Sequence, residues 1–192
     1  MVNAPSASKM TYDAYLAFER ASPERHEFAA GVVYAMSGGT AEHSTVAANV
    51  TAALHGLLRG SSCVTFSGDM RVRTGDDVAT YPDVSVACGE RLFTDASRDE
   101  LRNPTVIVEV LSPSTEAYDR GEKFAHYQTI ASLRDYVLVS TEAVRVEVFS
   151  RQDDGSWILR TFVAGGAVQM PSVEARMPVA ALYENATPGT RS

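Results

Sequence analysis

The chain has 192 residues, 45% of them hydrophobic and 21% charged, and its 24 acidic and 17 basic residues give a net charge of −7. This composition is ordinary for one globular domain and excludes the disordered, collagen-like and disulfide-scaffold classes. The acidic balance also excludes a protein that coats nucleic acid through a broadly positive surface, and leaves open only local contact with a phosphate backbone.

The apolar segments and the two cysteines bear on the compartment. No run of about 18 apolar residues is present, so we expect neither a membrane span nor a membrane partner. The first residues, MVNAPSASKM, lack the apolar stretch of a secretory signal. Cys63 and Cys88 each lie in an apolar run, which favours small buried thiols over a disulfide or a metal site. These features predict a protein of a reducing compartment, the cytoplasm.

The N-terminal part of the chain predicts a tail, a short helix, a hairpin and a long helix. Residues 1–10 are expected to form a flexible tail, and Thr11 can cap a helix over residues 12–19. Two β-prone runs on either side of Gly31 are typical of a hairpin. Apolar residues then recur at helical spacing between residues 40 and 59, which predicts the long helix.

The rest of the chain predicts mainly strands. The segment Asp119-Arg120-Gly121-Glu122 has the spacing of a capping box, which predicts a helix from there to about Thr129. Residues 89–103 are expected to form a polar connection, and residues 178–184 a short helix. Strands are expected over residues 63–66, 70–73, 81–88, 105–111, 135–139, 144–149 and 157–163.

This order of elements predicts an α/β (α+β) fold, with a mixed β-sheet flanked by helices and a β-rich C-terminal part. No internal repeat and no long linker divides the chain. Residues 11–186 are therefore expected to form a single domain between flexible tails at 1–10 and 187–192.

Two acidic residues stand out against their apolar surroundings. Glu109 lies in the run TVIVEVL, where a carboxylate is costly unless it is paired or binds a cation. A buried ion pair with an arginine, or a position at the open end of the strand, would also explain it. Asp83 follows Pro82 at the start of another strand, where aspartate is often only a turn residue. If the two carboxylates converge, their oxygens suit a hard divalent ion such as Mg²⁺.

Lys123 is the only lysine inside the predicted domain, because the other lysine, Lys9, lies in the predicted tail and all remaining basic residues are arginines. It follows Glu109 closely enough for the chain to fold back to the end of that strand. Beside a divalent ion, an amine or ammonium can orient a water or stabilise charge that develops on a phosphate. An exposed helical lysine is the alternative interpretation.

The segments YPDVSVACG and NPTVIVEVLSPSTEAYDRGEKFAHYQTIASLRDYVLVS closely resemble the Uma-type restriction endonucleases, a bacterial branch of the PD-(D/E)xK nuclease-like superfamily. The segments MTYDAYLAFE, RHEFAAGVVYAMSGG, SGDMRVR and LYENA match the same family in order and spacing. The resemblance implies a restriction-endonuclease-like mixed sheet flanked by helices. It also implies hydrolysis of nucleic-acid phosphodiesters that depends on Mg²⁺, with Mn²⁺ as an alternative ion.

The resemblance also implies roles for individual residues. Asp83 and Glu109 match metal ligands of the family, and the backbone carbonyl of Val110 is a further ligand. The usual lysine of the superfamily falls where this chain has Leu111, so Lys123 resembles a relocated catalytic lysine. Glu27 matches an early glutamate that supplies another carboxylate near the metal, although a solvated hairpin residue is the alternative.

Five further residues are candidates for contact with the substrate. His43 matches a recurrent family position, where it would contact a phosphate, assist proton transfer, or simply cap or pack. Arg71 and Arg73 are two residues apart and so lie on one face of a predicted strand. Both could meet phosphates there, unless that face is a solvated sheet edge. Arg120 and Tyr127 share the face of Lys123 at helical spacing. Aromatic residues are too few to predict a base-stacking platform, so binding would depend on the metal, a few arginines or a homodimer that gathers them.

The leading hypothesis is a metal-dependent endonuclease with nucleic acid, DNA in particular, as its substrate, and with a catalytic site formed by Asp83, Glu109, Lys123 and Glu27. The alternative is a non-catalytic binding or scaffold module of the same fold with a degenerate site, which the acidic balance and Leu111 favour. A serine hydrolase is a third class, but no serine of this chain lies in the Gly-x-Ser-x-Gly turn of such enzymes.

Overall fold

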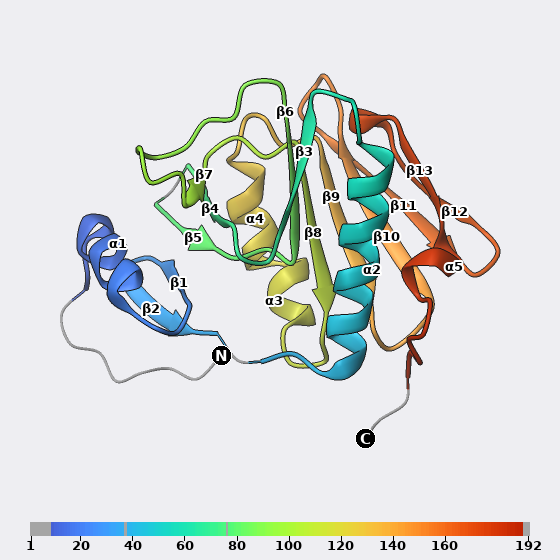
Figure 1. The fold of residues 1–192 in the computed structure, drawn as a ribbon, viewed down its shortest axis with the longest axis horizontal. Coiled ribbons are helices and arrows are strands. Elements are labelled where there is room, and N and C mark those ends of the chain that lie inside the picture. The colour runs from blue at the N-terminus through green and yellow to red at the C-terminus, as the bar shows by residue number, and fades with distance from the viewer. Residues whose placement is uncertain (1–8, 37, 76, 190–192) are drawn as a thin grey trace.

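The computed structural model describes residues 9–36, 38–75 and 77–189 (Figure 1). The expected tail at 1–10 lies outside this range except for its last two residues, of which Met10 donates its backbone N–H to Gly31 O at 2.9 Å. At the other end, Gly189 N donates to Thr141 O at 3.0 Å. The described part of the chain is therefore attached to the domain at both of its ends.

The central sheet is mixed and has six strands in the order β11-β10-β9-β8-β6-β3. Strands β8 and β9 are parallel, and the other neighbours are antiparallel. Because β8 and β9 are buried along their whole length, both faces of the sheet must be covered. The bounds are β3 Cys63–Ser67, β6 Val84–Cys88, β8 Val106–Leu111, β9 Asp135–Ser140, β10 Arg145–Arg151 and β11 Trp157–Val163.

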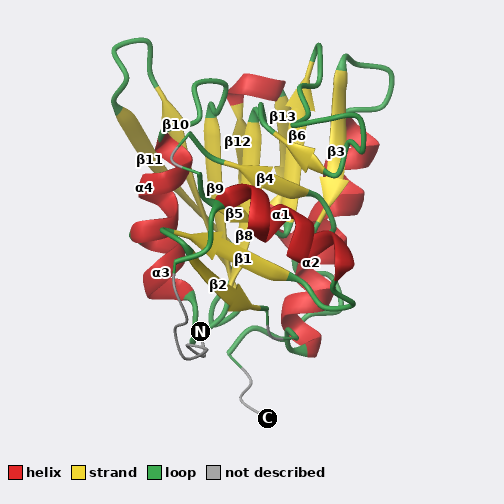
Figure 2. Ribbon diagram, turned by 90° about the vertical axis from the view of Figure 1, so that its left-hand side faces the viewer, coloured by secondary structure: helices red, strands yellow, loops and turns green. Residues whose placement is uncertain are grey.

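Helices cover the two faces of this sheet (Figures 1 and 2). On one face lies α2 (Ala41–Leu57), whose buried residues pack with alternate valines of β6, β8 and β9. On the other face lie α3 (Glu116–Arg120) and α4 (Glu122–Gln128), and Phe124 and Tyr127 of α4 pack with Ile107 and Tyr136. The connection between the parallel strands β8 and β9 thus passes through the predicted helical segment.

The predicted capping box is wrong. Asp119 lies inside α3 and is buried, and α4 follows Gly121 without a side-chain cap. Helical structure begins a turn earlier than the pattern indicated, since Ser112 O accepts hydrogen bonds from Thr115 N and Glu116 N. The carboxylate of Asp119 is therefore not used at a helix end.

A second, smaller sheet carries the N-terminal part of the chain, in the order β2-β1-β5-β4-β7. Helix α1 (Tyr12–Ala21) packs on it and begins at the predicted cap, where Thr11 Oγ1 accepts from Ala14 N. The predicted hairpin is confirmed, and its turn residues Ala30 and Gly31 have φ of 52° and 85°, as a tight two-residue turn requires. The bounds are β1 His26–Ala29, β2 Val32–Ala35, β4 Arg71–Arg73, β5 Ala79–Thr80 and β7 Glu100–Leu101.

The C-terminal part adds a two-stranded sheet of β12 (Ala167–Met170) and β13 (Ala175–Pro178), joined by a short 3₁₀ turn at Pro171–Val173, and then α5 (Val179–Leu182). Their apolar residues join α2 in the core on the same face of the central sheet. The predicted α+β class, with a mixed sheet flanked by helices, is confirmed. The sequence analysis did not predict β5, β7, β12 and β13.

The prediction of two free thiols is wrong. Cys63 on β3 lies directly opposite Cys88 on β6 in the antiparallel register, with the two Cα atoms 3.9 Å apart, and the residues form a disulfide. Both apolar runs contain strands as predicted, but the antiparallel register brings the two cysteines face to face, so the disfavoured alternative, a disulfide, is the one present. The cysteines therefore no longer support a reducing compartment.

Among the described helices, none combines the length and the apolar character needed to cross a membrane.

Candidate functional site

Asp83 and Glu109 meet where strands β6 and β8 end. Val84 pairs with Val108, so continuing the antiparallel register by one residue sets Asp83 opposite Glu109. The ladder stops at this point because the side chain of Asp83 takes the next amide, with Oδ2 accepting from Val110 N at 2.7 Å. The two acids therefore converge at one end of the central sheet, as the sequence predicted.

Lys123 reaches the same point from the first turn of α4. Its Nζ lies 2.9 Å from Glu109 Oε1, 3.1 Å from Glu27 Oε1 and 3.6 Å from Asp119 Oδ1. Only 6% of Lys123 is exposed, so it is not a solvated helical lysine. The partner of Glu109 is thus this lysine and not an arginine. Leu111, at the usual lysine position of the superfamily, is buried in the core beneath α4.

Glu27 comes from the other sheet. It lies on β1, and its Oε1 accepts from Tyr81 N at 3.2 Å as well as contacting Lys123. Its side chain is only 14% exposed, which excludes the solvated hairpin residue. The site therefore joins the two sheets through one ammonium group.

Burial sets the protonation of this cluster. It raises the pKa of Glu109 to about 8, because it penalises the charged carboxylate more than Lys123 favours it. Burial also raises the pKa of Asp119. It opposes the charged form of Lys123 too, but the surrounding acidic groups, Glu109 foremost, outweigh it and raise the pKa of Lys123 well above its ordinary value. Lys123 is therefore an ammonium, and burial makes Glu109 easier to protonate than an ordinary glutamate.

The two acids each keep one carboxylate oxygen available. Glu109 Oε1 accepts from Lys123 Nζ and from Tyr127 OH at 2.7 Å, and Asp83 Oδ2 takes the amide of Val110. Within residues 9–36, 38–75 and 77–189, Glu109 Oε2 and Asp83 Oδ1 have no hydrogen-bond partner. Two such oxygens and a neighbouring backbone carbonyl suit Mg²⁺ or Mn²⁺, which binds few protein ligands and keeps several waters.

A cage built entirely of protein ligands does not fit this site. Among the described residues, no group of three or more His, Cys, Asp or Glu side chains is arranged to hold a metal ion. The arrangement thus differs from closed zinc or calcium centres, which take four or more protein ligands.

The acidic residues and Lys123 line a cavity of about 360 Å³, here called the acidic cavity. Its walls come from two loops on opposite sides, one leading from β2 to α2 and the other from β8 to α3. Its lining includes Glu27, Tyr34, Asp83, Glu109, Ser112, Tyr118, Asp119 and Lys123.

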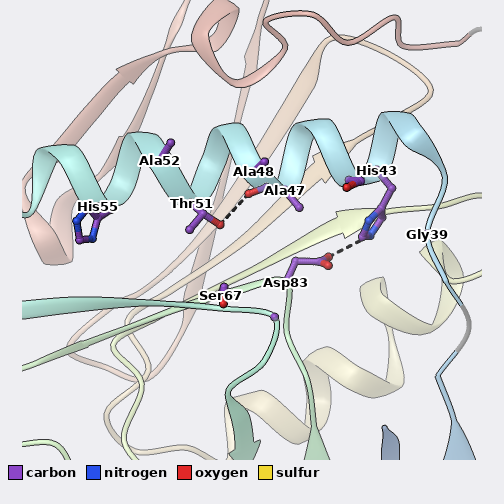
Figure 3. A pocket seen from close by; sticks show the side chains of 11 residues that line it. Gly39, His43, Ala47, Ala48, Thr51, Ala52, His55, Ser67 and Asp83 are labelled. Atoms are coloured by element: carbon purple, nitrogen blue, oxygen red, sulfur yellow. Dashed lines mark hydrogen bonds and ion pairs between the residues drawn. The ribbon is translucent and has the colours of Figure 1, made fainter. Parts of the chain in front are cut away.

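A second hollow of about 690 Å³ runs along α2, and we name it the helix groove (Figure 3). It is lined by small residues of α2 such as Ala47 and Ala48, by Thr51, and by the β3–β4 turn at Ser67. His43 and Asp83 line both the helix groove and the acidic cavity, so the two hollows meet at these residues.

His43 lies in the first turn of α2, three residues after the capping residue Thr40, and points toward Asp83 (Figure 3). Its Nε2 is 3.3 Å from Asp83 Oδ2, and this hydrogen bond is the main cause that raises the pKa of His43. A histidine that carries a proton here presents a cation beside the predicted metal ligand.

The other four candidate contacts lie away from both hollows. Arg71 is buried and bonds to Glu100, Arg73 lies over the ring of Tyr12 and pairs with Asp77, and Arg120 pairs with Glu116 and Glu147. Tyr127 is fully buried behind Glu109. None of the four lines the acidic cavity or the helix groove, so the structure does not place them in contact with a substrate.

Sequence reasoning missed several residues of the acidic cavity, among them Tyr34, Tyr118 and Asp119. A signal existed for Asp119, because it precedes Lys123 by four residues and therefore shares its helical face. No comparable signal existed for the two tyrosines, since they belong to loops and elements that meet only in the folded chain.

Comparisons with known proteins agree on one family and one fold. Residues 12–179 match the model of the Uma2 family, described as "Putative restriction endonuclease". Two uncharacterized proteins of Synechocystis sp. are similar: slr1290 is 34% identical over 186 residues, covering 95% of this chain and 97% of its own, and sll1609 is 32% identical over 159 residues, covering 82% and 90%.

A solved structure is also similar. The crystal structure of "a putative nuclease belonging to DUF820" from Anabaena variabilis matches with a TM-score of 0.74 at 19% identity, covering 91% of this chain and 98% of that chain. This likeness concerns the fold, which is restriction-endonuclease-like.

Proposed function

Because the chain belongs to the Uma2 family, whose fold is that of restriction endonucleases, we propose that it hydrolyses nucleic-acid phosphodiester bonds with the help of Mg²⁺ or Mn²⁺. The observation that carries the proposal is the buried ammonium of Lys123, in contact with Glu109 and Glu27 and next to Asp83 in one cavity. DNA is the proposed substrate. A homodimer is the proposed assembly.

The residues that would hold the ion are Asp83, Glu109 and the backbone carbonyl of Val110. When bound, the ion would polarise the phosphate and lower the pKa of the attacking water. For this, Glu109 must release its proton, and Tyr127 and Lys123 keep its other oxygen in place meanwhile. The hydrogen bond from Val110 N does the same for Asp83.

Lys123 would act on the reacting groups directly. Its ammonium orients the attacking water or stabilises the negative charge that develops on the phosphate. Glu27 and Asp119 position this ammonium from the sides that face away from Glu109. Water attacks the phosphorus and the 3′-oxygen leaves, so the product carries a 5′-phosphate.

The test compares cutting by matched variants. Purified protein is incubated with plasmid and Mg²⁺ or Mn²⁺, and Asp83→Asn and Lys123→Ala are expected to lose cutting. Glu122→Ala, an exposed neighbour of Lys123, and Lys9→Ala, the other lysine, are expected to cut like the wild type. Equal cutting by Asp83→Asn and the wild type would overturn the proposal, because a contaminating nuclease would then explain the products.

A non-catalytic module of the same fold is the second candidate. It is favoured by one observation, which is that Lys123 is already surrounded by carboxylates. Titration calorimetry with Mg²⁺ and Mn²⁺ separates the two functions. A protein that binds neither ion and cuts nothing would be the scaffold.

A further inference from the structure

The acidic cavity limits what can reach the predicted metal ligands. Glu109 and Asp119 are each 4% exposed, and Lys123 is 6% exposed, so these groups lie at the bottom of the cavity. A volume of about 360 Å³ has the scale of a single nucleotide, and it is far too small to admit the width of a double helix. The cavity therefore has room for about one nucleotide at a time.

Two tyrosines line the same cavity beside the acidic cluster. Tyr34 on β2 lies opposite Glu27 in the hairpin register, and Tyr118 precedes Asp119 on α3. Both are half-buried. Within the described part of the chain, neither ring packs on another aromatic ring or on a cation, and neither hydroxyl has a hydrogen-bond partner. Part of each tyrosine side chain thus faces the cavity and can contact a bound molecule.

The charge of the protein also favours an unpaired strand over a duplex. The net charge is −7, and the three candidate arginines, Arg71, Arg73 and Arg120, line neither hollow. A duplex is bound mainly through many cationic contacts with its two backbones. A single strand can instead be bound by stacking of its bases on aromatic side chains, which is independent of sequence because every base has a π-face.

We propose that the nucleotide presented to this site is unpaired, either in a single strand or extruded from a duplex, with its base against Tyr34 and Tyr118. Its phosphate then reaches Asp83, where the acidic cavity opens into the helix groove, and the groove offers the continuing strand a path along α2 (Figure 3). This inference rests on the proposed nuclease function and adds the class of substrate to it.

The experiment uses three substrates of one sequence, namely a single strand, a perfect duplex, and a duplex with a short internal stretch of mismatched nucleotides. With Mn²⁺ or Mg²⁺, the wild-type protein is expected to cut the single strand and the mismatched stretch at least about ten-fold faster than the perfect duplex, because extrusion from a perfect duplex must first overcome pairing and stacking. Products are mapped on a sequencing gel, which shows whether cuts cluster at the unpaired nucleotides.

Tyrosine variants test the stacking itself. Tyr34→Ala and Tyr118→Ala are each expected to lower kcat/KM on the single strand by about ten-fold, the effect of losing one stacked base. Tyr34→Phe and Tyr118→Phe keep the ring and are expected to stay within about two-fold of the wild type. Binding to non-cutting Asp83→Asn is followed with a single strand that contains 2-aminopurine, whose fluorescence falls when the base stacks.

The outcomes separate the two proposals. If the wild type cuts none of the three substrates with either ion, the proposed nuclease function fails. If it cuts, but cuts the perfect duplex as fast as the single strand, the nuclease function stands and the inference about unpaired nucleotides is overturned. This comparison needs only the wild-type protein, so it stays decisive even where a tyrosine variant is unstable.

Discussion

Glu109 is the residue at which protonation and the proposed metal binding would compete. Its pKa is raised to about 8 by burial, so an ion that binds its carboxylate at pH 7 must displace a proton. Because the raised value means that the proton is bound below pH 8, the proposed affinity is weakest at low pH. It should increase as the pH rises and level off above pH 8.

We therefore expect the affinity for Mn²⁺ to rise about ten-fold from about pH 6.5 to about pH 7.5. The measurement is titration calorimetry in two buffers of different ionisation enthalpy, which also counts the protons released on binding. Glu109→Gln is the control, because it has no proton to release. An affinity that stays constant across this range would contradict the assignment of Glu109 as a ligand.

The sequence predicted Asp83, Glu109, Lys123 and Glu27 as site residues. Each is a polar residue that either has apolar neighbours or matches a position of the family. It misinterpreted Asp119, whose short local pattern fits a helix cap equally well. A capping box depends on where the helix begins, and that start is set by the chain before it, at Ser112. Local pattern alone therefore could not separate a cap from a buried carboxylate.

At the scale of elements, β3 and β6 are joined by the disulfide between Cys63 and Cys88, which are 25 residues apart in the chain. Strand β3 is an edge strand, and β6 leads directly from Asp83. The cross-link limits the freedom of the unfolded chain and so favours the folded state. It also holds the edge strand next to the strand that positions a predicted ligand.

Reduction is therefore expected to lower the free energy of unfolding by about 2–4 kcal/mol. Urea denaturation with and without dithiothreitol measures the difference, and a Cys63→Ser/Cys88→Ser double variant should not respond to the reductant. The mass of the intact oxidised protein should be two hydrogens below that of the reduced one. Two masses that coincide would show that the thiols are free.

Helix α1 and the small sheet are held together by a buried ion pair. Arg71 Nε donates to Glu100 Oε2 at 2.8 Å, and the hydroxyl of Tyr12 on α1 donates to the same carboxylate oxygen. Arg71 is 2% exposed and Glu100 is fully buried. Removing the cation would leave the carboxylate buried without its partner.

Arg71→Met is accordingly expected to cost about 3–5 kcal/mol in the free energy of unfolding. Arg73→Met on the same strand is the control, because its partner Asp77 is exposed, and its cost should stay below about 1 kcal/mol. Thermal and urea denaturation measure both. Equal small losses would mean that Arg71 is not the cation that Glu100 requires.

The strand pattern placed Arg71 and Arg73 on one face of the strand, but it did not show which element covers that face. The cover is α1, which comes from an earlier part of the chain and docks through aromatic contacts among Tyr12, Tyr15 and Phe28. Strands β5, β7, β12 and β13 escaped prediction because they have only two to four residues. Such short strands are defined by their partners and not by their own periodicity.

At the scale of the whole molecule, charge predicts how the protein responds to salt. With a net charge of −7 and few cations at the two hollows, each molecule should neutralise only one or two phosphates. The logarithm of the affinity for a single strand should then fall with the logarithm of the salt concentration with a slope of about −1 to −2.

Fluorescence anisotropy with Asp83→Asn at several salt concentrations measures this slope. A second oligonucleotide of the same length but of mixed sequence shows whether the slope depends on base composition. A slope of about −5 or steeper would contradict the expectation, and it would mean that an assembly of several copies gathers a cationic surface that one chain lacks.

Glu27 is supplied by the N-terminal sheet and Glu109 by the central sheet, and Lys123 lies between them. The candidate site is therefore also one of the contacts that join the two layers. A copy whose N-terminal layer has not yet docked, or has come loose, lacks a complete set of reactive groups even while the rest of its core is intact. Under the proposed function, such a chain would lack nuclease activity both during synthesis and during degradation.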